Sequence, residues 1–114
     1  MVRVLLADDD PAVCSALRLL LEQESGLEVV GEVGAADALT AWLRWQEADI
    51  LIVDWELPGW PCPDMDACSG RPKLIAISGR AEARAQALAA GADGFVSKTD
   101  TPEQILATLR GVLT

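Results

Sequence analysis

The sequence predicts an α/β protein, a doubly wound parallel sheet of five strands with helices on both faces. Strand-like apolar runs alternate with segments of helical periodicity along the whole chain, as in parallel sheets with crossover helices. Two of these runs, 49–54 and 73–78, are almost wholly apolar, which is typical of strands buried on both faces. The length of 114 residues suits one core, so we expect residues 1–114 to form a single domain.

The first strand and helix are marked by a clear boundary. Residues 2–7 are an apolar run that stops at consecutive aspartates. Asp10 and Pro11 then supply an N-cap and a first-turn proline for a helix that ends before Gly26. The apolar positions of this helix repeat at helical spacing on one face: Val13, Ala16, Leu17, Leu20 and Leu21.

The middle of the chain contains three further strands or strand-like runs and one regular helix. Residues 27–33 are the second strand, and 35–46 a helix with Leu39, Trp42 and Leu43 on its inner face and Trp45 off it. Strands 49–54 and 73–78 follow. The segment between them contains Pro61 and Pro63, so we expect 60–71 to be irregular, with no helix longer than about two turns.

The C-terminal part returns to regular elements. Residues 81–90 are an alanine-rich helix that ends at Gly91, and 94–98 form a short last strand. Thr101 and Gln104 then make a capping box around a first-turn proline. The last helix has an apolar stripe of Ile105, Leu109, Val112 and Leu113.

Charge and composition restrict the function classes. The net charge of −9 would repel a nucleic-acid backbone, so we expect no direct nucleic-acid binding by this domain. The apolar N-terminal run is too short for a membrane span or signal peptide. An odd number of cysteines favours a reducing, cytoplasmic compartment over a disulfide framework. Without histidine, Cys14, Cys62 and Cys68 give little support for zinc.

Polar residues occur where four predicted strands end. Asp8 and Asp9 follow the first strand, Asp54 ends the third, Ser78 ends the fourth and Lys98 ends the fifth. Ligands of such sheets bind beyond the carboxyl ends of the strands, so we expect these side chains to meet at one edge. Three carboxylates together require a cation, and oxygen ligands suit Mg²⁺.

A phosphoryl-transfer site fits the same residues. The ammonium of Lys98 and the hydroxyl of Ser78 would donate to phosphoryl oxygens. Asp54 is then the predicted nucleophile, which would form an aspartyl phosphate.

The chain resembles the receiver domain of two-component response regulators over essentially its whole length. The motifs that carry the resemblance are "ADDDP", "VDWELPG", "IAIS" and "AGADGFVSK". The stretch "GFVSK" with "TPEQILATLRGVL" is most similar to the NarL/FixJ (LuxR-type) group, which usually carries a C-terminal helix-turn-helix. The resemblance implies a flavodoxin-like sheet of order 2-1-3-4-5. In the family, a third helix lies between the third and fourth strands. Compared with the family pattern, the segment 59–72 is short by about six residues, nearly two turns of that helix.

The resemblance also implies a role for each site residue. Asp54 would be the phospho-acceptor, with Mg²⁺ bound by Asp54, by Asp9 directly and by Asp8 through water, together with the backbone carbonyl of Glu56. Lys98 would neutralise phosphoryl charge. Ser78 would bind the phosphoryl group and move inward with Phe95, the aromatic switch position. The donor would be a sensor histidine kinase, and a C-terminal DNA-binding effector would be a partner.

The sequence departs from the family pattern at three places. Glu56 places a carboxylate two residues past the acceptor, where its charge would repel an attacking water or the phosphoryl donor. Thr99 stands where proline is usual after the lysine, and Phe95 lacks the hydroxyl of the tyrosine variant. The loss of most of the third helix would uncover part of a sheet face, which Trp60 and Met65 or a second copy in a homodimer would cover. Trp45, Trp55 and Trp60 are a candidate apolar patch for a partner.

Two alternatives remain open from the residues. A degenerate receiver would bind proteins without ever taking phosphate. A haloacid-dehalogenase-type phosphatase would use Asp8 as nucleophile, but Ala12 differs from its motif and Asp54 would then have no role. We therefore predict a receiver that is not a turnover enzyme.

Overall fold

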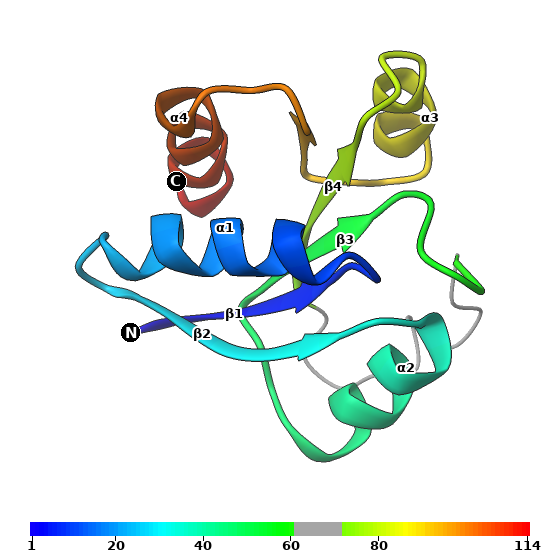
Figure 1. The fold of residues 1–114 in the computed structure, drawn as a ribbon. Coiled ribbons are helices and arrows are strands. Elements are labelled where there is room, and N and C mark those ends of the chain that lie inside the picture. Colours follow the sequence, from blue (N-terminus) through cyan, green and yellow to red (C-terminus); the bar gives the residue numbers. More distant parts are fainter. Residues whose placement is uncertain (61–71) are drawn as a thin grey trace.

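The computed structural model describes residues 1–60 and 72–114, which form one parallel sheet with helices on both faces (Figure 1). The strand order is β2-β1-β3-β4-β5 and every pair is parallel, which confirms the predicted fold class and topology. In chain order the elements are β1 Val2–Ala7, α1 Pro11–Glu22, β2 Leu27–Val33, α2 Ala36–Trp45, β3 Ile50–Asp54, β4 Lys73–Ser78, α3 Ala83–Ala89, β5 Gly94–Ser97 and α4 Pro102–Leu113.

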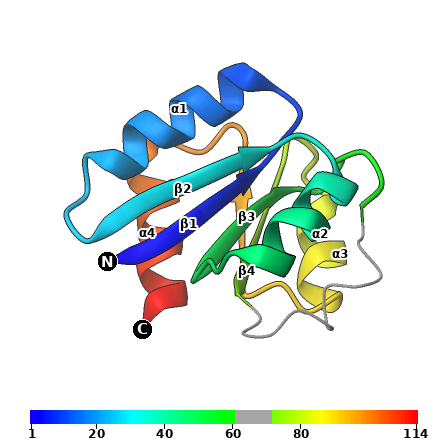
Figure 2. The same cartoon turned by 90° about the horizontal axis from the view of Figure 1, so that it is seen from below.

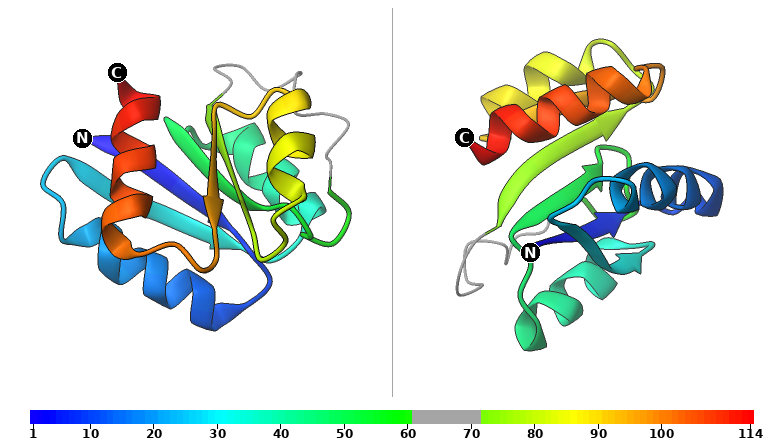
Figure 3. Two further views of the ribbon diagram at one scale, coloured as in Figure 1. Left: turned by 90° about the horizontal axis from the view of Figure 1, so that it is seen from above. Right: turned by 90° about the vertical axis from the view of Figure 1, so that its left-hand side faces the viewer.

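The helices cover the two faces of the sheet in pairs. Helices α1 and α4 lie on one face, and α2 and α3 on the other (Figures 2 and 3). Alternate residues of the central strands supply the two cores: Val4 and Leu6 of β1 pack under α1 and α4, whereas Leu5 packs under α2. This alternation explains why β1 and β3 are apolar at nearly every position.

The local signals of the sequence match the observed helix ends. Asp10 caps α1 by accepting a hydrogen bond from the backbone N–H of Ala12, and Thr101 and Gln104 form the predicted capping box of α4. Gly91 has a φ of 101°, a left-handed conformation that suits glycine at the end of α3. Helix α3 begins at Ala83 rather than at residue 81, because residues 81 and 82 form a turn and the N-cap, Glu82, makes no side-chain capping bond.

The predicted irregular segment between β3 and β4 lies outside the described residues, apart from Trp60, and so do Cys62, Cys68 and Met65. Trp60 is half-buried against the core under α2 and meets Trp55 edge to face, with ring centroids 5.7 Å apart. Trp45 is 88% exposed on α2. Two of the three tryptophans of the proposed partner patch therefore contact the core, and coverage by a second copy stays a prediction.

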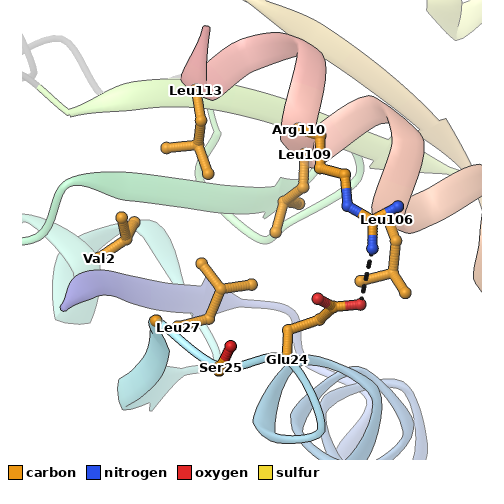
Figure 4. A pocket seen from close by; sticks show the side chains of 9 residues that line it. Val2, Glu24, Ser25, Leu27, Leu106, Leu109, Arg110 and Leu113 are labelled. Atoms are coloured by element: carbon orange, nitrogen blue, oxygen red, sulfur yellow. Dashed lines mark hydrogen bonds and ion pairs between the residues drawn. The ribbon is translucent and has the colours of Figure 1, made fainter.

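A hollow lies at the end of the sheet opposite the strand ends that carry the aspartates. It is a cavity of about 300 Å³ between the start of β1, the loop after α1 and helix α4 (Figure 4). Its lining is mostly apolar, and Arg110 and Glu24 form an ion pair of 2.9 Å at its side. Among the described helices, none is long and apolar enough to cross a membrane.

Candidate functional site

The register of the sheet brings the polar strand ends together. Ala7 pairs with Val53 in the β1–β3 ladder, so Asp8 and Asp54 stand side by side one step further along their strands. Ser78 ends the neighbouring strand β4, and the backbone N–H of Lys98 donates to its carbonyl across 2.9 Å. Asp54 and Ser78 are buried, with exposed fractions of 3% and 0%. The predicted convergence of these residues at one edge is thus what the structure has.

Three carboxylates form the centre of the site. Oxygen atoms of Asp8, Asp9 and Asp54 all lie within 4.8 Å of one another. One oxygen of each buried member is already engaged, because Asp8 Oδ1 accepts from the N–H of Asp10 at 2.9 Å and Asp54 Oδ1 accepts from the N–H of Glu56 at 3.0 Å. Asp8 Oδ2 is buried and makes no hydrogen bond to the described residues, but it lies in an ion pair with Lys98 Nζ, 3.4 Å away. An all-oxygen donor set that includes a buried acceptor without a hydrogen bond suits a hard divalent cation.

Lys98 is the cation that faces this cluster. Its Nζ lies 3.3 Å from Asp54 Oδ2 and 3.4 Å from Asp8 Oδ2. Burial alone would lower the pKa of Lys98, but the charges of Asp54 and Asp8 outweigh it and raise the pKa above its ordinary value. One ammonium against three carboxylates leaves the cluster negative, and a divalent cation would balance it.

The surroundings of Asp54 raise the pKa of its carboxyl group. Burial, which disfavours the charged form, raises its pKa from 3.8 to about 6, and the nearby carboxylates of Glu56 and Asp8 act in the same direction. The N–H of Glu56 and the ammonium of Lys98 oppose this rise. A perturbed carboxyl group at a strand end is a candidate nucleophile.

Ser78 belongs to a second set of contacts beside Asp54. Its hydroxyl donates to Glu56 Oε1 at 2.8 Å and accepts from the N–H of Arg80 at 3.0 Å. The guanidinium of Arg80 also binds Glu56 Oε1, with Nε at 2.6 Å. Burial would raise the pKa of Glu56, but the hydrogen bonds from Arg80 and Ser78 lower it to about 2. Glu56 is therefore a carboxylate.

The remaining predicted residues lie close to this site. Phe95 is buried on β5 against Ala76 of β4 and the two alanines that α3 turns inward. Thr99, in the position where proline is usual, joins a small network in which its N–H and its hydroxyl both contact Ser97 Oγ. The carbonyl of Glu56 remains a predicted metal ligand.

Sequence reasoning missed the role of Arg80 and of the Glu56 side chain. The sequence assigns Glu56 a metal-binding carbonyl and a repelling charge, and it assigns no role to Arg80. The only signal was a pair of opposite charges, each two residues past a site residue, Asp54 or Ser78. An ion pair between these two charges can be expected only once β3 and β4 are known to be neighbours.

A parallel sheet of this order with acidic strand ends, a strand-end serine and a facing lysine defines the class of phosphoryl-accepting signalling domains. The sequence matches the family described as "Response regulator receiver domain" over residues 4–110. The chain therefore belongs to the response regulator receiver domain family, as the resemblance of its motifs predicted.

Known relatives place it near the LuxR-type regulators. It is 30% identical to the response regulator UvrY of Escherichia coli K12, over 98% of this chain and 54% of UvrY. RcsB of Salmonella enterica serovar Typhimurium, solved bound to promoter rprA with the phosphomimetic BeF3⁻, has a TM-score of 0.87 and 25% identity, covering 100% of both chains. A LuxR-family regulator from Aurantimonas sp. SI85-9A1 has a TM-score of 0.85 and 27% identity, covering 97% of this chain and 84% of its own.

These matches confirm the predicted family and its LuxR-type group. The chain spans about half the length of UvrY, 54%, so the two correspond over the receiver part only. The chain is a receiver module of phosphorylation-based two-component signalling.

Proposed function

We propose that this receiver accepts a phosphoryl group on Asp54 in the presence of Mg²⁺, from a sensor histidine kinase in the cytoplasm. The observation that carries the proposal is the placement of the Lys98 ammonium against both Asp8 Oδ2 and Asp54 Oδ2. That placement supplies a nucleophilic carboxylate, a cation for phosphoryl oxygens and an acidic cluster at one point of the sheet edge.

The transfer itself needs few protein groups. An oxygen of ionised Asp54 attacks the phosphorus of a phosphohistidine, the new O–P bond forms, and the electrons of the broken P–N bond go to the imidazole, which takes up a proton. Lys98 binds a phosphoryl oxygen and compensates its charge. Ser78 donates its hydroxyl hydrogen to another.

Asp8, Asp9 and Asp54, with the carbonyl of Glu56, are the residues that would hold Mg²⁺. When bound, the ion would neutralise charge on the phosphoryl oxygens and on the carboxylates. The donor set fits because it contains only oxygen, and because Asp8 Oδ2 is buried without a hydrogen bond from the described residues.

The signal would be read by an effector. Relatives such as RcsB, solved on promoter DNA, support a DNA-binding effector as the partner of this receiver. The receiver carries a net charge of −9, so the DNA contact belongs to the effector. Phe95 and Ser78 are the residues proposed to relay the phosphorylated state. The domain catalyses its own modification and is not a turnover enzyme.

The test is intact-mass measurement after incubation with acetyl phosphate and Mg²⁺. We expect one added phosphoryl group on the wild type, none without Mg²⁺ and none on Asp54→Asn. Unchanged labelling of Asp54→Asn would reject Asp54 as acceptor, and absence of labelling on the wild type would favour a phosphorylation-independent binding module. Repeated hydrolysis of acetyl phosphate that survives Asp54→Asn but is lost in Asp8→Asn would instead indicate a phosphatase.

A further inference from the structure

The Glu56 side chain extends from the loop after β3 to Ser78 and Arg80, at the end of β4 and just beyond it. Its Oε1 accepts the hydroxyl hydrogen of Ser78 at 2.8 Å and the Nε–H of Arg80 at 2.6 Å. The backbone N–H of the same residue donates to Asp54 Oδ1 at 3.0 Å. Glu56 thus contacts the proposed acceptor through its backbone and the proposed phosphoryl-binding hydroxyl through its side chain.

These contacts are the ones that the phosphoryl group needs. An incoming phosphoryl group on Asp54 would carry anionic oxygens, and one of them would accept the hydrogen of Ser78. In this structure the oxygen that takes that hydrogen belongs to Glu56. A hydroxyl has one hydrogen to donate, so Ser78 cannot serve both anions, and two anions side by side repel each other.

Arg80 holds Glu56 in this position. It is tied to the site by its own backbone N–H, which donates to Ser78 Oγ at 3.0 Å. Its guanidinium also lies 3.7 Å from Glu82, so Arg80 forms ion pairs with both Glu56 and Glu82. The side chains of Glu56 and Arg80 are 40% and 48% exposed, so they have room to turn outward together.

We propose that the Glu56 carboxylate takes the place of a phosphoryl oxygen at Ser78, that Arg80 holds it there, and that it must release Ser78 before Asp54 is phosphorylated. We call this arrangement of Glu56, Ser78 and Arg80 the latch. The inference rests on the function proposed above and adds a residue that sets the rate of the reaction. Glu56 acts through Ser78 and through the space beside Asp54, and is a positioning residue rather than a nucleophile or a donor. Its release allows the hydroxyl of Ser78 to turn to the phosphoryl oxygen.

The experiment compares phosphorylation rates from acetyl phosphate with Mg²⁺ in the wild type, Glu56→Ala, Glu56→Gln and Glu82→Ala, followed by intact mass. We expect Glu56→Ala to react roughly tenfold faster, because the competing acceptor is gone. Glu56→Gln should gain clearly less, since its amide oxygen still accepts from Ser78. Glu82→Ala removes an equal charge from Arg80 but leaves Ser78 untouched, and should stay within about twofold of wild type.

A second measurement does not depend on phosphoryl transfer. Beryllofluoride with Mg²⁺ is a non-transferring phosphoryl mimic, and its binding can be followed by the fluorescence of Trp55, which adjoins Asp54. Affinity should rise in the same order, with Glu56→Ala tightest and Glu82→Ala unchanged. Circular dichroism and thermal unfolding check that each variant is folded.

The outcomes separate the two proposals. If the wild type is labelled on Asp54 but Glu56→Ala is no faster and binds beryllofluoride no tighter, the latch is rejected and the proposed function stands. If Glu56→Gln equals Glu56→Ala, charge repulsion alone explains the effect and the latch is likewise rejected. If the wild type takes up no phosphoryl group at all, the proposed function fails and the latch with it.

Discussion

Lys98 Nζ lies 3.3 Å from Asp54 Oδ2, although the two residues are 44 positions apart in the chain. Strand β4 stands between their strands, and the backbone bond from Lys98 to the carbonyl of Ser78 fixes the loop that carries the lysine. The same ammonium lies 3.4 Å from Asp8 Oδ2. Two buried carboxylates therefore share one cation, and the first two predictions follow from this imbalance of charge.

Asp9→Ala should weaken Mg²⁺ binding much more than Asp10→Ala. Asp9 belongs to the acidic cluster, whereas Asp10 Oδ1 accepts from the N–H of Ala12 at 2.9 Å and caps α1. Asp10→Ala should instead lower the free energy of unfolding by roughly 1 kcal/mol. Titration of Mg²⁺ followed by the fluorescence of Trp55 measures the affinity, and urea unfolding measures the stability. Equal losses of affinity in the two variants would contradict this division of roles.

Asp54 should make the folded protein less stable as the pH rises through about 6. Its pKa is 3.8 ordinarily and about 6 in the fold, chiefly through burial. The folded state then holds the proton more tightly than the unfolded chain, so the folded state loses relative stability as Asp54 ionises between about pH 4 and 6. Glu56, with its pKa lowered to about 2, has the opposite sign: its stabilisation is present above about pH 4.5 and is lost as the pH falls toward 2.

The Asp54→Asn variant isolates the first effect, because Glu56 is present in both proteins. Urea unfolding without divalent cations should show that the variant gains on the wild type by on the order of 1–3 kcal/mol between about pH 4 and 7. The difference should then be constant at higher pH. A difference that does not change from pH 4 to 7 would mean that Asp54 ionises alike in both states.

Gly31→Ala should destabilise the fold, because β2 has no room for a side chain at this position. A Cβ on residue 31 would lie 2.9 Å from Trp42 Nε1 and 3.2 Å from Leu5 Cδ1. We expect a loss of about 1–3 kcal/mol in the free energy of unfolding. Gly111→Ala is the matched control: it lies in α4, its Cβ would meet no described atom within 4 Å, and it should gain about 0.5–1 kcal/mol. A loss of similar size in both variants would show that crowding is not the cause.

The sequence predicts those features that depend on neighbours along the chain. Asp10 with Pro11 and Thr101 with Gln104 set helix starts through bonds that span a few residues, and the structure has both caps. The meeting of Asp8 with Asp54 was also predictable, because parallel strands share the edge where they end.

The Glu56–Arg80 bond was not predictable in this way. It depends on two side chains from adjacent loops turning toward each other, 24 residues apart. The start of α3 was likewise missed by two residues, because the alanine-rich segment gives a uniform helical preference and no capping side chain marks the boundary. A single sequence therefore carries little information about two features, the contacts between loops and the positions of uncapped helix ends.

The burial of Asp8 beside Asp54 has a consequence for how this chain can change over generations. A neutral substitution at either position would relieve the repulsion between the two carboxylates. Folding stability alone would therefore favour asparagine at these positions. Selection for signalling must oppose that drift at every step. In a descendant that no longer used the phosphoryl group, replacement of these aspartates would raise the folding stability. The fold would then persist after the phosphoryl chemistry had been lost.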